Sequence, residues 1–319
     1  MSQEGVLTGT RVVVHQGPQR RSAGKRALRM LRRGRLGLAG VVIFLVVVFA
    51  AIAAPLIAPA DPKEQDLRAR LTCPVGTSCA RFGANPPQTI TGSSKHLLGT
   101  DNLGRDIYSR ILYGAKVSLI VGFTAVALGG GIGTVLGLLS GYFGGALDAV
   151  IGRIADVQLA FPFLLLAILI SIVSGPGLKN VIIILSIGAW VPFVRVVRGS
   201  TLAAKEYEYV IAARTVGARP PAILFRHILP NVITPVIVIA TFAVAQTIIA
   251  EASLSFLGLG VGTSVPTWGN MLADGRAYVG TAWWLATFPG VAIMLTVLSV
   301  NLIGDWLRDI LDPRLRNTG

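Results

Sequence analysis

The sequence predicts an all-α integral membrane protein with six membrane-spanning helices. Of its 319 residues, 53% are hydrophobic and only 14% are charged, whereas a soluble domain carries about 25% charged residues. The 29 Lys and Arg outnumber the 15 Asp and Glu, but nucleic-acid binders carry their basic side chains on otherwise polar surfaces. The composition therefore disfavours both a soluble enzyme and a nucleic-acid partner, and indicates a membrane protein with basic edges.

Long uncharged stretches define the spans. A helix needs about 20 apolar residues to cross a bilayer, and five stretches without Asp, Glu, Lys or Arg reach this length. They are residues 36–60, 117–147, 157–178, 228–250 and 277–304. A sixth stretch, residues 180–194, is short, although the cations that flank it can extend to the membrane surface and lengthen it.

Basic residues decide the sixth span and the orientation. Residues 1–35 hold nine Lys and Arg against one acid, Glu4, and the positive-inside rule places such a segment in the cytoplasm. Six further Lys and Arg lie within residues 195–230, which are cytoplasmic only if residues 180–194 cross the membrane. We therefore predict six helices with both termini in the cytoplasm.

The same counts divide the chain into segments. Residues 1–35 form a basic arm, expected to be partly disordered and to meet anionic lipid headgroups, and residues 36–58 form the first helix, a retained signal anchor. An extracytoplasmic loop follows over residues 59–115. The membrane core covers residues 116–304, with a cytoplasmic loop at 199–230. The tail, residues 305–319, has alternating charges that favour a solvated interfacial helix over a partner contact.

The extracytoplasmic loop contains both cysteines of the chain, Cys73 and Cys79. We predict a disulfide because this side of the membrane is oxidising. Two free thiols remain the alternative, since spacing alone does not fix disulfide geometry. Without neighbouring histidines the pair makes a poor metal site, so no metal is expected.

Several apparent catalytic signatures fail. Residues 99–106 have the glycine spacing of a phosphate loop, but Arg105 and Asp106 stand where Lys and Ser or Thr bind phosphate and magnesium. An intramembrane Ser/His dyad lacks a base near Ser171 or Ser174. The histidines of the chain are His15, His96 and His227. The chain is therefore expected to be non-catalytic.

Glycines repeat every fourth residue in the second predicted span, at Gly133, Gly137 and Gly141. Small residues at this spacing let two membrane helices approach closely. A dinucleotide-binding turn would need a preceding strand, which an uncharged span does not supply. We therefore expect these glycines to pack helices.

The cytoplasmic stretch 205–231 predicts a short helix. Acidic residues near its start suit the helix dipole, and Gly217 is a stop signal. About 12 helical residues would extend about 18 Å, short enough to lie across the cytoplasmic face. The small side chains of Ala212 and Ala213 would allow close approach to a partner groove. From the residues alone, an ordinary amphipathic interfacial helix is the alternative.

A family resemblance favours the interpretation that the helix at 205–231 docks in a groove of a partner. The pattern A-A-x-x-x-G with a downstream L-P, at Ala212, Ala213, Gly217, Leu229 and Pro230, resembles the EAA loop of bacterial ABC-importer permeases. Ile211 stands where the name-giving Glu would be, and His227 where Ile is usual. The forms E-Y-V-x-A-A-R and H-I-L-P-N are instead similar to the dipeptide/oligopeptide/nickel branch, the DppC/OppC-type subunits.

Four further segments are similar to the same branch. They are H-L-L-G-T-D-N-L-G-R-D-I-Y-S-R (residues 96–110), E-A-S-L-S-F-L-G-L-G (251–260), W-G-N-M-L (268–272) and N-L-I-G-D-W-L-R-D-I-L-D-P-R (301–314). The likeness runs from about residue 35 to residue 316. Only the basic arm and the cysteine-containing insertion have no role that the resemblance implies.

The resemblance implies a type I ABC-importer permease fold in a bacterial cytoplasmic membrane. It implies a second homologous permease subunit, two cytoplasmic ATPase subunits that hydrolyse ATP with Mg, and an extracytoplasmic peptide-binding protein. This chain would bind no cofactor itself. The loop would dock in a cleft of an ATPase, with coupling residues Glu208, Tyr209, Ala212, Ala213, Arg214, Gly217, Leu229 and Pro230.

Glu251 lies at the outer end of the fifth predicted span, where an acid is costly in lipid and is expected to face protein or water. It either lines a substrate path with Ser253 and Ser255, or caps the turn that ends near Gly260 by bonding backbone groups. We favour the structural role, because in this family broad peptide specificity usually resides in the binding protein.

The leading functional prediction is import of di- or oligopeptides. Nickel or glutathione uptake by the same scaffold is the nearest alternative. A secondary transporter is disfavoured, because it would need inverted repeats and helices broken at mid-membrane, which six spans with a cytoplasmic docking loop fit poorly. A stand-alone channel is disfavoured because it would have no use for the loop at 205–231.

Overall fold

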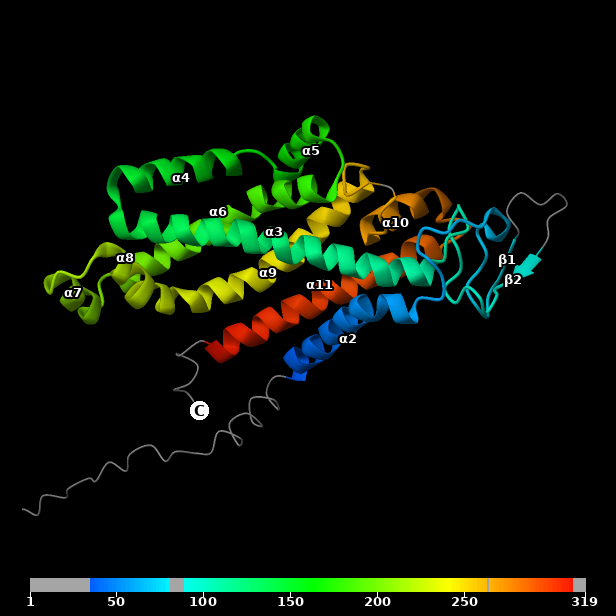
Figure 1. The fold of residues 1–319 in the computed structure, drawn as a ribbon, viewed down its shortest axis with the longest axis horizontal. Helices are drawn as coiled ribbons and strands as arrows, with labels where there is room; N and C mark the ends of the chain where they lie inside the picture. The colour runs from blue at the N-terminus through cyan, green and yellow to red at the C-terminus, as the bar shows by residue number, and fades with distance from the viewer. Residues whose placement is uncertain (1–34, 81–88, 263, 312–319) are drawn as a thin grey trace, which may run out of the picture. The chain divides into compact units, whose positions relative to one another are not determined.

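The computed structural model describes residues 35–80, 89–262 and 264–311, and within them the fold is all-α apart from one short hairpin (Figure 1). The predicted basic arm up to residue 34, with its expected disorder, and the tail beyond Leu311 lie outside the described residues. The long helices are α2 (Arg35–Ile57), α3 (Ile107–Phe143), α4 (Gly145–Leu159), α5 (Phe163–Ser174), α6 (Leu178–Ala204), α9 (Leu229–Phe256) and α11 (Trp284–Leu311).

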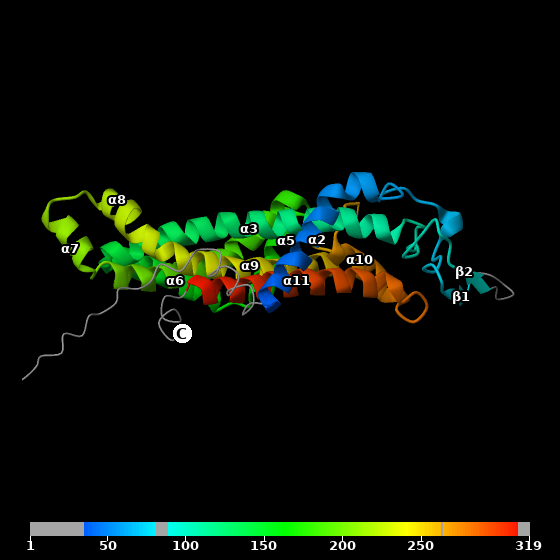
Figure 2. The ribbon, with the colours of Figure 1, turned by 90° about the horizontal axis from the view of Figure 1, so that it is seen from below.

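Shorter elements connect these helices. They are α7 (Glu208–Thr215), α8 (Pro220–Ile223), α10 (Trp268–Gly275), the 3₁₀ helices η1 (Leu67–Ala69) and η3 (Arg276–Tyr278), and a π-helical turn, η2 (Leu224–Ile228), that joins α8 to α9. Strands β1 (Ser78–Ala80) and β2 (Thr89–Thr91) pair antiparallel, with Cys79 opposite Ile90. In the bundle of residues 36–311, α7 and α8 lie at one end and β1 and β2 at the other (Figures 1 and 2).

Five of the helical runs are long and apolar enough to cross a membrane, and the pair α4–α5 makes a sixth crossing if it counts as one span bent by 87°. The predicted span at residues 157–178 falls on this bend, whereas the short stretch 180–194 belongs to the 27-residue α6. Pro162 precedes α5 and has no N–H to continue the ladder from α4. The prediction of an all-α membrane protein is confirmed, with five or six candidate spans. The short stretch 180–194 lies within a long helix, whereas the full-length stretch 157–178 is broken by the bend.

Glycines decide how α3 packs on α6. A Cβ on Gly133, Gly137 or Gly141 would overlap a backbone carbonyl of α6, that of Trp190, Val194 or Arg198 respectively. Since the partners advance by four residues together, the two helices run parallel in close contact. A parallel pair requires the intervening chain to return to the other end of the bundle, as α4 and α5 do (Figure 1).

Three further boundaries differ from the prediction because charged residues are accommodated inside helices. Helix α3 begins ten residues before the predicted span, at Ile107, because Asp106 caps it by accepting from the Ser109 N–H. Helix α6 continues through Arg198, whose guanidinium pairs with Asp148 of α4 at 2.5 and 2.6 Å. Similarly α11 extends to Leu311, so the first seven residues of the predicted tail continue the last helix.

Candidate functional site

Helix α7 has one buried apolar side chain that packs on the bundle. Val210 is fully buried and packs with Ile223 and Ile228 of the α8–η2 segment. Most other side chains of α7 are exposed. A helix of two turns is too short to be stable alone, so this apolar anchor and the turn that follows hold it in place.

Gly217 ends α7 in a left-handed conformation, with φ +81°. The N–H of Gly217 donates to the carbonyl of Arg214, and the N–H of Ala218 donates to that of Ala213, both at 3.0 Å. These two bonds form a Schellman motif, whose left-handed position favours glycine because it has no Cβ. The glycine of the sequence pattern therefore turns the chain from α7 into α8.

Polar side chains tie α7 to the neighbouring helices. The Asn231 amide donates to the Tyr209 hydroxyl at 2.8 Å and to the His227 carbonyl at 2.6 Å. The Arg214 guanidinium lies 5.6 Å from the ring centroid of Tyr142, near the end of α3, a cation–π distance. These contacts link α7 directly to α9 and to α3.

The structure brings the eight predicted coupling residues to one end of the bundle. Glu208, Tyr209, Ala212, Arg214, Gly217 and Pro230 are exposed, and Ala213 and Leu229 are half-buried. Sequence reasoning missed the apolar side chains exposed beside them, Ile211, Val216 and Phe225, of which Val216 is 88% exposed. Exposed apolar side chains are typical of a surface that contacts another molecule, and the signal that could have found them is the apolar residues within the stretch 205–231.

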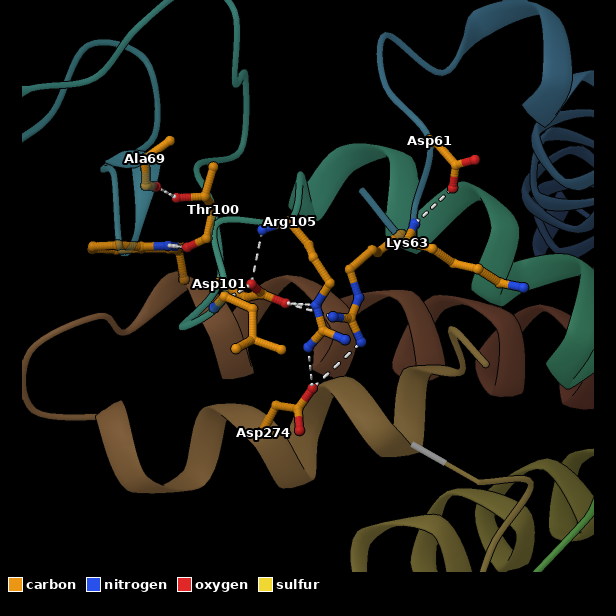
Figure 3. A network of polar contacts seen from close by, with 10 residues as sticks. Asp61, Lys63, Ala69, Thr100, Asp101, Arg105 and Asp274 are labelled. Atoms are coloured by element: carbon orange, nitrogen blue, oxygen red, sulfur yellow. Dashed lines mark hydrogen bonds and ion pairs between the residues drawn. The ribbon is translucent and has the colours of Figure 1, made fainter. Parts of the chain in front are cut away.

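The opposite end carries a cap held together by ion pairs, which we define as residues 59–80 and 89–110 together with α10. Asp101 is its centre: its carboxylate accepts from Arg105 Nε at 2.6 Å and from Arg110 Nη1 at 2.5 Å. Asp274 of α10 accepts from the same two arginines, at 3.0 and 3.4 Å (Figure 3). Two arginines and two aspartates thus join segments far apart in the sequence, and Arg110 is 1% exposed.

Three other contacts complete the cap. His96 Nδ1 lies 3.0 Å from Asp106 Oδ1, and the Trp284 indole donates to the Thr100 carbonyl at 3.2 Å. A disulfide joins Cys73 to Cys79 of strand β1, with Cα atoms 6.1 Å apart. The glycine-rich segment 99–106, which lacks the residues of a phosphate loop, instead holds the start of α3 in place.

The three residues predicted for a substrate path separate. Glu251 and Ser255 are buried, and the Ser255 hydroxyl donates to Glu251 Oε1 at 2.8 Å while Ser118 of α3 donates to Oε2 at 3.3 Å. Glu251 thus bonds side-chain hydroxyls rather than the turn backbone that the sequence suggested. Ser253 is half-buried, and its hydroxyl donates to the Ile249 carbonyl. Among the described residues, no three His, Cys, Asp or Glu are grouped to hold a metal ion.

Comparison with known proteins identifies the family. Residues 133–317 match the family of binding-protein-dependent transport system inner membrane components, and residues 22–74 match the N-terminal TM domain of oligopeptide transport permease C. The chain is 43% identical to the dipeptide transport system permease protein DppC of Escherichia coli K12, over 89% of this chain and 91% of that protein. It is 41% identical to the di/tripeptide transport system permease protein DppC of Pseudomonas aeruginosa, over 89% of each.

A solved structure supports the fold. An inward-facing structure of the MetNI methionine ABC transporter matches with a TM-score of 0.53 and 21% identity, covering 63% of this chain and 96% of that one. The multi-pass helical architecture, the exposed α7 and the sequence matches agree. The chain belongs to the family of binding-protein-dependent transport system inner membrane components, the permease subunits of ABC importers.

Proposed function

We propose that this chain is one of two related permease subunits of an ATP-driven importer that carries di- or oligopeptides across a bacterial cytoplasmic membrane. The observation that carries the proposal is the helix α7, exposed at one end of the bundle in a chain 41–43% identical to permeases named for dipeptides and tripeptides. An exposed helix with small side chains at Ala212 and Ala213 offers a shape that a partner groove can accept.

Helix α7 is proposed to dock in a cleft of a cytoplasmic ATPase subunit. Two such subunits bind ATP with Mg²⁺, and their closure pushes on α7, while this chain binds no nucleotide itself. Val210 transmits the push to the segment that leads into α9, and Arg214 transmits it to α3 through Tyr142. The eight coupling residues are proposed to work through these two routes.

The orientation follows from the same proposal. The α7 end and both termini are cytoplasmic, and the cap faces the outside, where an extracytoplasmic peptide-binding protein delivers the substrate. A disulfide between Cys73 and Cys79 suits that side, since disulfides persist in oxidising compartments. The basic arm is proposed to meet anionic lipid headgroups.

A charge placed on α7 tests the coupling role. Ala213→Glu puts a carboxylate on a half-buried position of α7, and Ala212→Glu puts one on its exposed face. The matched control is Ala146→Glu, an exposed alanine in the first turn of α4, where an acid suits the helix dipole.

The complex is reconstituted in liposomes with its binding protein, and uptake of a labelled dipeptide and co-purification of the ATPase pair are measured. We expect uptake to fall at least about tenfold in both α7 variants, the loss from one unsatisfied charge at an interface, with normal membrane insertion. Ala146→Glu should transport normally. Normal uptake in Ala213→Glu would count against the coupling role, and uptake of nickel or glutathione in place of peptide would overturn the substrate class.

A further inference from the structure

Two glutamines lie within the membrane-crossing helices, and they are used differently. In α4, Gln158 donates from Nε2 to the Ile187 carbonyl and accepts from the Trp190 indole at Oε1, both at 2.6 Å, so both ends of its amide are paired. In α9, Gln246 is exposed, and its amide has no hydrogen-bond partner among the residues the structure describes. Gln158 therefore joins two helices of this chain, whereas Gln246 faces outward from it.

Gln246 lines a cavity of about 430 Å³ between α5, α6 and α9. Along α9, the cavity is lined at steps of three and four residues by Phe242, Gln246, Ile249 and Ser253, which places these side chains on one face. The opposite wall includes Phe163, the first residue of α5 after the bend, which packs over Gly188 of α6 so closely that a Cβ there would overlap its ring. The bend between α4 and α5 thus shapes this cavity.

The character of this face excludes simple contact with lipid. An amide loses its hydrogen bonds in hydrocarbon, and polar side chains within membrane helices almost always face the bundle interior or a water-filled space. Apart from the hydroxyl-bearing Thr247 and Ser253, the other lining residues are apolar, so the cavity pairs one neutral amide with surfaces that accept varied side chains. This is the chemistry of a site that holds a peptide main chain without selecting among its side chains.

We propose that Gln246 lines the path of the transported peptide and that its amide hydrogen-bonds the peptide main chain. The inference rests on the proposed peptide-import function and deepens it. Oε1 accepts from a peptide N–H, and Nε2 donates to a peptide carbonyl, so one side chain serves any sequence. Ser253, one of the three residues named for a substrate path, lines the same cavity, whereas Glu251 is buried and is not among its lining residues.

Thiol accessibility tests the position of Gln246. Both cysteines of the chain are in the disulfide, so Gln246→Cys creates a single free thiol. The matched control is Met294→Cys on α11, an exposed residue outside this cavity that, like Gln246, lies ten residues from the end of its helix nearer to α10.

In the assembled complex, a charged, water-soluble thiol reagent should label Gln246→Cys at least about tenfold faster than Met294→Cys, because thiolates form in water and not in lipid. Equal rates would overturn the proposal. Loss of the second permease subunit on purification of Gln246→Leu would also overturn it, since the amide would then belong to a subunit interface.

Backbone-modified substrates test the hydrogen bond. A dipeptide and the matching ester, in which O replaces the peptide N–H, are compared for uptake by the wild type and by Gln246→Leu, with the isosteric change Gln158→Leu as control. Whatever the binding protein contributes is common to all three and cancels from the ratio of amide to ester uptake. We expect that ratio to fall roughly 5-fold in Gln246→Leu, the size of one neutral hydrogen bond, and to stay at the wild-type value in Gln158→Leu.

The results that would overturn the role of Gln246 differ from those that would overturn peptide import. An unchanged amide-to-ester ratio in Gln246→Leu overturns the main-chain bond while leaving peptide import intact. A wild-type complex that takes up no peptide overturns the proposed function instead, and labelling of Gln246→Cys still decides whether this residue faces an aqueous path.

Discussion

The two ends of the bundle are held by different kinds of contact. The cap is cross-linked by four buried or half-buried charges, a disulfide and a tryptophan bond to the Thr100 carbonyl. The α7 end depends on one buried valine, a Schellman turn and contacts made at the surface. Buried charge networks cost much to break, whereas exposed contacts contribute little. The comparison indicates a stiff cap and an α7 end that is free to adjust to a partner.

The largest effect is expected from Arg110→Ala in the cap. The change leaves Asp101, 1% exposed, with half of its ion pairing lost, and removing one partner of a buried pair costs about 3–5 kcal/mol. Denaturant unfolding of the purified protein in detergent measures the loss. Arg153→Ala, an exposed arginine of α4, should change stability by less than about 0.5 kcal/mol, and equal losses for the two would refute the contrast.

One substitution made at both ends compares them directly. Gly104 in the cap and Gly217 after α7 have φ of +76° and +81°, and alanine costs about 1–2 kcal/mol in that conformation. A Cβ on Gly104 would also overlap the Asp66 carbonyl, whereas nothing lies within 4 Å of one on Gly217. We expect Gly104→Ala to cost about 2–4 kcal/mol after adding overpacking and Gly217→Ala only about 1 kcal/mol, by the same unfolding assay. A reversed order would contradict the comparison.

Removal of the disulfide should loosen the cap alone. For a closed loop with sequence separation 6, the chain-entropy model gives about 2 kcal/mol. In Cys73→Ala/Cys79→Ala, limited proteolysis within residues 59–106 should accelerate while co-purification of the ATPase pair stays unchanged. A reductant should reproduce this in the wild type and add nothing in the double variant; a matching loss of ATPase binding would show that the ends are coupled more tightly than the contacts indicate.

The smallest effect is expected from Tyr209→Phe at the α7 end. It removes the hydroxyl that accepts from Asn231 at an exposed site, worth about 0.5–1 kcal/mol at most. The free energy of unfolding of the permease should fall by no more than this amount, while its affinity for the ATPase pair falls about twofold. Tyr207→Phe serves as control, because that ring packs against Tyr209 at 5.7 Å and its hydroxyl has no hydrogen-bond partner among the described residues. A larger loss in the control would assign the effect to the rings.

Local patterns predicted much of the architecture. Apolar runs located the crossings, the glycines at four-residue spacing marked the α3–α6 contact, and the small residues of the A-A-x-x-x-G pattern marked α7. The bend between α4 and α5 was missed because residues 157–178 carry no charge and a length rule does not register Pro162. The early start of α3 was missed because Arg110 looks costly in a span until Asp101 and Asp274 are seen beside it.

The sequence by itself determined most of the segments that are apolar enough to cross a membrane, which end of the chain is basic and where the short helix α7 lies, because these depend on neighbours within a few residues. Only the tertiary structure decided which charges pair, since Arg105 and Asp274 are 169 positions apart. It also separated Gln158 from Gln246, two similar residues in apolar helices: the first has its hydrogen bonds inside the chain, and the second must find them elsewhere. Burial and pairing arise from the packing of distant segments, and residue spacing does not encode them.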